Sequence, residues 1–88
     1  MPNISKFYGI NIDMYFYDNI RHNMPHIHAS YNEYDAVFDL QGEMIEGKMP
    51  NSQKKLIQAW IEIHREELER LWDLLINGKN GFKINPLK

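Results

Sequence analysis

The sequence predicts an α+β fold, an antiparallel three- to four-stranded meander with one face covered by a long C-terminal helix that is either straight or bent. Apolar and polar residues alternate along short segments of the first half, which is the period of half-buried strands. In the second half, apolar residues recur every three or four positions, as on one face of a helix. We expect a single domain over residues 1–88, strand-rich over 1–48, helical over 51–77 and extended over 79–88.

Three strands and a shorter fourth are expected in the first half. Apolar side chains occupy the even positions of residues 10–16 and the odd positions of residues 26–31, which follow a proline that blocks a helix. Residues 34–40 alternate in the same way, and a Gln-Gly turn leads into residues 43–46. Consecutive short strands joined by short turns predict an antiparallel meander.

A helix is predicted over residues 52–77. Asn51 or Ser52 is a suitable N-cap, and Gly78 stands where many helices end. One stripe of this helix is expected to face the core and contains Ile57, Trp60, Ile61, His64, Leu68, Leu71, Trp72 and Leu75.

The predicted helix is long for so short a chain. At 1.5 Å per residue it would extend for about 39 Å, whereas a compact domain of this size has a radius of gyration of ~12 Å. It therefore either bends near residues 63–65 or protrudes and leaves apolar surface for a second subunit. The tail is expected to be extended and docked by Phe82 and Ile84, since a free tail rarely carries such residues.

Strand alternation predicts where two of the three clustered histidines, His22, His26 and His28, point. His26 and His28 occupy polar positions of the second strand, so we expect both on the open face of the sheet, away from the helix. If residues 32–33 form a two-residue turn, His26 pairs with Asp39 across the strands, which sets a carboxylate beside an imidazole. His22 falls in the preceding loop.

These side chains are the candidate site, and three interpretations of them are open. His26, His28 and Asp39 could hold a divalent metal such as zinc, with coordination positions left open for a substrate. Without a metal, His26 or His28 could act as a general acid or base oriented by Asp39. The third interpretation is a pair of solvated imidazoles beside an aspartate, without a chemical role.

The same face is expected to carry Asn11, Asp13, Tyr15 and Asp35. A tyrosine beside histidines can stack on the bases of single-stranded RNA. The aspartates would repel phosphates, and the formal net charge is −2, with no block of lysine or arginine. RNA is therefore a less favoured partner than protein.

His64 belongs to the helix stripe and so to the other side of the sheet from His26 and His28. We expect a neutral histidine with a structural role, bonded to Glu67 three residues along the helix. The other structural positions expected in the stripe are the core residues Trp60, Leu68 and Trp72.

Composition limits the compartment and the chemistry. The chain has no cysteine, which excludes disulfides and thiolate ligands. It has no apolar run long enough to cross a membrane, and its first residues lack the apolar segment of a signal peptide. We expect a cytoplasmic protein without a membrane partner.

Several short motifs, each weak alone, occur together over nearly the whole chain. They are residues 1–10, 14–15, 25–29 and 46–50, followed by Trp60, residues 64–68 and Trp72. In this combination the chain resembles the small bacterial family called domain of unknown function 4160. The chain departs from the family pattern before Pro25, where the segment is longer and Met24 replaces a proline. The pattern carries over onto Pro25, His26, His28, Ala29, Gly47, Pro50, Trp60, His64, Glu67, Leu68 and Trp72.

The resemblance implies a short bacterial protein of no settled activity, often encoded beside another small protein and sometimes proposed as half of a toxin–antitoxin pair. Two classes of function follow. The first is an interaction protein that binds a protein partner, or a second copy of itself, through the helix stripe, an edge strand or the open face. The alternative is a small metal-dependent or acid/base hydrolase, such as a ribonuclease, that uses His26 and His28. The first is favoured because no nucleophile, phosphate-binding loop or basic groove accompanies the histidines.

Overall fold

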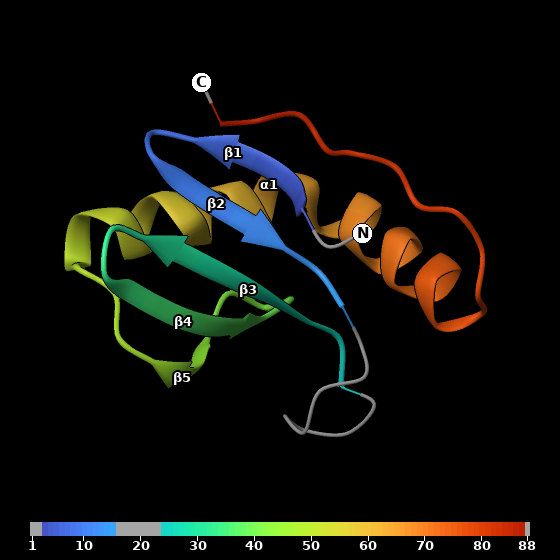
Figure 1. The fold of residues 1–88 in the computed structure, drawn as a ribbon, viewed down its shortest axis with the longest axis horizontal. Helices are drawn as coiled ribbons and strands as arrows, with labels where there is room; N and C mark the ends of the chain where they lie inside the picture. The colour runs from blue at the N-terminus through green and yellow to red at the C-terminus, as the bar shows by residue number, and fades with distance from the viewer. Residues whose placement is uncertain (1–2, 16–23, 88) are drawn as a thin grey trace.

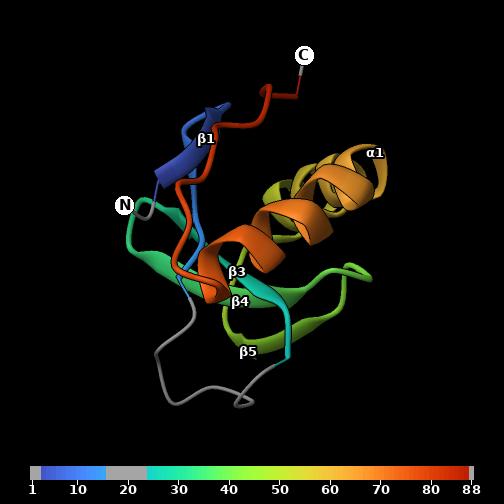
Figure 2. The same ribbon diagram turned by 90° about the vertical axis from the view of Figure 1, so that its right-hand side faces the viewer.

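The computed structural model describes residues 3–15 and 24–87 of the chain. The elements, in chain order, are β1 (Asn3–Phe7), β2 (Ile10–Asp13), β3 (His26–Tyr31), β4 (Tyr34–Asp39), β5 (Met44–Gly47) and α1 (Asn51–Ile76). The strands form one antiparallel sheet in the order β1-β2-β3-β4-β5, and α1 lies across one of its faces (Figures 1 and 2). The predicted α+β meander is confirmed, with five strands in the described ranges rather than three or four.

The strand β1 is the element that alternation does not predict. Its register against β2 shifts between Asn3 and Ser5, and the irregularity leaves the neighbouring residues Ile4 and Ser5 both buried. A bulge of this kind interrupts the two-residue period on which strand prediction depends. The turn into β2 has two residues with positive φ, Tyr8 at 50° and Gly9 at 78°, as the favoured hairpin turns require.

The predicted pairing of the second and third strands is confirmed. The pairs of β3 and β4 run from Tyr31 opposite Tyr34 to His26 opposite Asp39. Other strand ends lie one to three residues from their predicted positions: β2 ends at Asp13, β4 ends at Asp39, and β5 begins at Met44.

The helix begins at Asn51, one residue earlier than predicted. The expectation of an Asn51 or Ser52 cap is wrong, because Pro50 precedes the helix and no side chain caps it. The carbonyl of Pro50 instead accepts the first helical hydrogen bond, from the Lys54 amide at 2.8 Å. At the other end the helix stops at Ile76, two residues before Gly78, whose φ is +73°.

The helix bends, which decides between the two alternatives that its length leaves open. His64 has φ −110° and ψ 20°, outside the helical region, and divides α1 into two segments. The longest extent of the molecule is 34 Å, shorter than the ~39 Å of a straight helix with the 26 residues of α1. The kink lets both segments lie over the same sheet.

One hydrophobic core fills the space between sheet and helix. The tail closes one side of it, running beside β1 (Figure 2), where the Ile84 amide donates to the Ile4 carbonyl at 2.9 Å. Ile84 is buried and Phe82 partly buried, as predicted for a docked tail. Along the described part of the chain, no helix is both long and apolar enough to cross a membrane. The buried helix residues of the core are Ile57, Trp60, Ile61, Leu68, Leu71 and Trp72.

Candidate functional site: a groove on the open face

Two rows of side chains cross the sheet face that points away from α1. Residues directly opposite one another on neighbouring strands project from the same face. The register therefore places one row on four successive strands and a shorter row beside it on three. The first row is Asp13, His28, Val37 and Glu46, and the second is Asn11, Ser30 and Asp35.

A groove of about 400 Å³ lies over the residues of these rows other than Asn11, and it is lined also by Tyr15, Ala29, Ala36 and Gly47. Val37 forms its floor. The Val37 side chain is only 6% exposed, although it does not belong to the hydrophobic core between sheet and helix. This face thus contains a recess with an apolar base, rather than being a flat polar surface.

An aromatic pair forms one wall of the groove. The rings of Tyr15 and His28 are stacked, with centroids 4.2 Å apart and planes 10° apart. The prediction that Asp13, Tyr15 and Asp35 share a face with His28 is confirmed, since all four line the groove.

Glu46 is a groove residue that sequence reasoning missed. Alternation along residues 34–40 and the two-residue turn place Val37 on the open face opposite His28, as observed, whereas Glu46 belonged to the short fourth strand. The alignment of Glu46 with Val37 could not be predicted because the register of β4 and β5 shifts between Val37 and Phe38. A register shift moves side chains from one face to the other.

His26 lies apart from the groove, and the expectation that its ring is exposed is wrong. The ring is fully buried, with its centroid 5.2 Å from that of Trp72 on α1 and 5.3 Å from that of His28. The described pairing of β2 with β3 ends at His28, so His26 lies beyond the end of β2, where the helix reaches it. Nδ1 of His26 is 2.7 Å from the Met24 carbonyl oxygen and donates its proton there.

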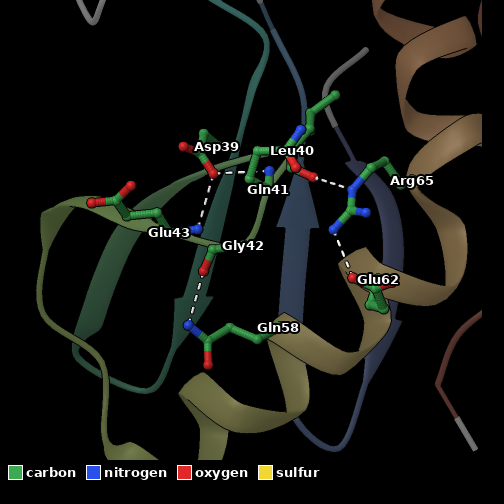
Figure 3. Close-up of polar contacts among 8 residues, drawn as sticks. All are labelled: Asp39, Leu40, Gln41, Gly42, Glu43, Gln58, Glu62 and Arg65. Carbon is green, nitrogen blue, oxygen red and sulfur yellow. Dashed lines mark hydrogen bonds and ion pairs between the residues drawn. The ribbon is translucent and has the colours of Figure 1, made fainter.

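The carboxylate of Asp39 organises the β4–β5 turn. Its Oδ1 accepts hydrogen bonds from the amides of Gln41 and Glu43, both at 2.9 Å (Figure 3). Asp39 is the strand partner of His26, as predicted, but these bonds direct its carboxylate to the turn.

The same turn is attached to the helix. Gln58 Nε2 donates to the Gly42 carbonyl and Arg65 Nε to the Leu40 carbonyl, each at 2.8 Å, while Arg65 also pairs with Glu62 (Figure 3). These contacts fix the position of the β4–β5 hairpin relative to α1 and therefore the shape of the groove that β5 borders.

No set of three metal ligands is assembled in residues 3–15 and 24–87. No group of three histidine, aspartate or glutamate side chains there is arranged to hold a metal ion. His26, His28 and Asp39 therefore do not form such a group. His22 lies outside the described residues.

His64 is remote from the groove and located at the helix kink. Its Nδ1 bonds the Glu67 carboxylate, the partner expected from the i, i+3 spacing. The side chain is 13% exposed, and its ring centroid is 5.5 Å from that of Trp60. The surroundings are those of a structural histidine.

The charge of the groove is negative. Asp13, Asp35 and Glu46 line it, and among the described lining residues there is no lysine or arginine. Asp13 accepts a hydrogen bond from the neutral amide of Asn3, Nδ2 to Oδ1, at 3.2 Å, and no contact to a basic side chain is described for Asp35 or Glu46. A cationic group is the electrostatic complement of this surface.

Comparison with known proteins gives one match. No curated protein and no solved structure matches the chain significantly. A family model described as "Domain of unknown function (DUF4160)" matches residues 9–73, well over half of the chain, including β2 to β5 and most of α1. The chain belongs to the domain of unknown function 4160 family.

Proposed function

We propose that this chain is a small cytoplasmic bacterial interaction protein that binds a protein partner through the open-face groove, as one component of a two-gene module of the toxin–antitoxin kind. The observation that carries the proposal is the recess with Val37 at its base. A nearly buried apolar side chain outside the core, surrounded by polar groups, is typical of a binding surface.

The helix and the sheet edges are weaker candidates for the same role. The apolar stripe of the helix is already buried in the core. At one edge of the sheet, the tail forms a backbone hydrogen bond with β1. At the other edge, β5 has only four residues and a register shift beside it. Short, irregular edge strands discourage pairing with another chain. Among the described residues a second hollow lies on α1, lined by Glu62, Ile63, Arg65, Glu66 and Glu67. The groove is preferred because its base is a nearly buried apolar side chain.

A matched pair of serine substitutions tests the proposal. Ser30→Arg places a long cationic side chain in the groove from a half-buried position, whereas Ser52→Arg places the same side chain on the exposed first turn of α1. Each variant would be co-expressed with the protein encoded next to it, and the dissociation constant of the purified complex measured by calorimetry.

The proposal predicts that Ser30→Arg abolishes the complex and that Ser52→Arg leaves its affinity unchanged. Equal affinities, or no complex with the wild-type chain, would refute it. A wild-type homodimer that Ser30→Arg alone dissociates would identify a second copy of the chain as the partner.

One observation favours hydrolase chemistry as the second candidate. His28 lies in the groove directly opposite Asp13 on the neighbouring strand, an arrangement in which a carboxylate can orient an imidazole for acid/base work. In this candidate the buried ring of His26, whose centroid is 5.3 Å from that of His28, helps to hold the His28 ring in position. The test measures hydrolysis of single-stranded RNA with and without added zinc. An activity that is lost in His28→Gln, while that variant still binds the partner, would favour the enzyme.

A further inference from the structure

The groove carboxylates are spread over several strands. Asp13 and Glu46 stand at the two ends of the four-strand row, so their backbones are three strand spacings, or about 14 Å, apart across the sheet. This separation is far larger than the coordination sphere of a metal ion. It agrees with the finding that no three acidic or histidine side chains in the described ranges are grouped for a metal.

Two of the carboxylates are closer to each other. Glu46 pairs with Val37, and Asp35 precedes Val37 by two residues on β4. Diagonal neighbours of this kind are about 7–8 Å apart. A planar group with several N–H donors fits between them and can bond both, whereas a compact ammonium bonds one well.

Gly47 lets β5 approach β4 closely in this part of the groove. A Cβ built at Gly47 would lie 2.2 Å from the Asp35 carbonyl oxygen and 2.7 Å from the Ala36 Cα, so no other residue fits this backbone. The close approach of the two strands holds Glu46 near Asp35. The stacked rings of Tyr15 and His28 stand on the other side of the Val37 floor, and aromatic rings attract guanidinium groups.

We infer that the groove accepts the guanidinium of an arginine side chain from the partner, bridged by Asp35 and Glu46, with its aliphatic stem on Val37. This inference rests on the proposed function and adds the chemistry that the partner must present. It predicts selectivity for arginine over lysine, because the planar fork of a guanidinium can bond two carboxylates at once.

The test uses a small probe and the full-length chain. N-acetyl-arginine amide is titrated into ¹⁵N-labelled protein and followed by amide NMR, beside N-acetyl-lysine amide and the uncharged N-acetyl-citrulline amide. The arginine probe should shift the amide signals of Ser30 and Glu46 with saturation. The lysine probe should bind roughly tenfold more weakly, having lost one charge-assisted hydrogen bond, and the citrulline probe should cause no saturable shift.

Acid-to-amide variants provide the matched controls. Glu46→Gln and Asp35→Asn should each weaken the arginine probe roughly tenfold, while Glu69→Gln, at an exposed acidic residue on α1, should not. In the spectrum of each variant, the amide signals that keep their wild-type positions show that the variant is folded.

Equal binding of arginine and lysine probes, binding of citrulline, or unchanged affinity in both groove variants would overturn the inference. These failures are separable from failure of the proposed function. If Ser30→Arg abolishes the partner complex but the arginine probe does not bind, the groove is an interaction surface for other chemistry.

Discussion

The ring of His26 lies 5.2 Å from the ring of Trp72, centroid to centroid, where the first residue of β3 meets the second half of the helix. Both side chains are buried. The two neighbouring histidines of this strand therefore have different surroundings, since His26 is packed against the helix and His28 lines the groove.

His26→Ala is expected to lower the free energy of unfolding by about 2–4 kcal/mol, because it leaves a cavity beside Trp72 and removes the donor to the Met24 carbonyl. His28→Ala, at a half-buried groove position, should cost clearly less. Urea denaturation followed by tryptophan fluorescence measures both. Equal losses of stability would show that the burial of His26 contributes little.

The sequence was a good guide to His28 and a poor one to His26, for a physical reason. Alternation predicts which side of a strand a residue occupies, and the pairing of His28 with Val37 and of His26 with Asp39 follows from one two-residue turn. Alternation does not indicate where the neighbouring strand stops. Because β2 pairs with β3 only as far as Asp13, the surroundings of His26 at the start of β3 depend on packing against the helix and not on strand pairing.

Two further features could not be predicted from local patterns. The strand β1 was missed because a bulge makes Ile4 and Ser5 both inward-facing. Glu46 was not assigned to the site because a second irregularity shifts the register of β5. The helix, by contrast, was predicted within one residue at each end because its apolar period is maintained across the His64 kink.

Gly47→Ala should destabilise the protein strongly. The new methyl carbon would lie 2.2 Å from the Asp35 carbonyl oxygen at a residue with φ +91°, which we expect to cost about 2–4 kcal/mol. Gly78→Ala is the matched control, with φ +73° but no atom within 4 Å of the added carbon, and should cost only about 1 kcal/mol. Thermal unfolding compares the two. Similar melting temperatures would mean that backbone conformation alone, and not the close approach of β4, requires glycine at residue 47.

The tail should contribute measurably to stability. Ile84 is 3% exposed, and the neighbouring Asn85 carbonyl accepts the indole N–H of the buried Trp60 at 2.8 Å. Ile84→Ala should cost about 2–4 kcal/mol, and the exposed Lys83→Ala almost nothing. If chemical denaturation gives wild-type stability for Ile84→Ala, the tail is not part of the core in solution.

His64→Ala is expected to cost about 1–2 kcal/mol, through a lost contact with Trp60 and a lost bond to Glu67. Glu67→Ala removes only the bond and should cost less. Glu66→Ala, on the exposed side of the same turn, is the control and should leave the midpoint of denaturation unchanged. A cost for Glu66→Ala as large as that for His64→Ala would indicate a general effect on the helix rather than a contact at the kink.

The most direct test of the groove as the binding surface is an amide NMR spectrum of the ¹⁵N-labelled chain recorded with and without the protein encoded beside it. The groove account predicts that the largest shifts occur at Asp13, Ser30 and Glu46, on the face opposite the helix. Shifts concentrated instead at Glu62, Ile63 and Glu66, on the exposed side of the helix, would contradict it.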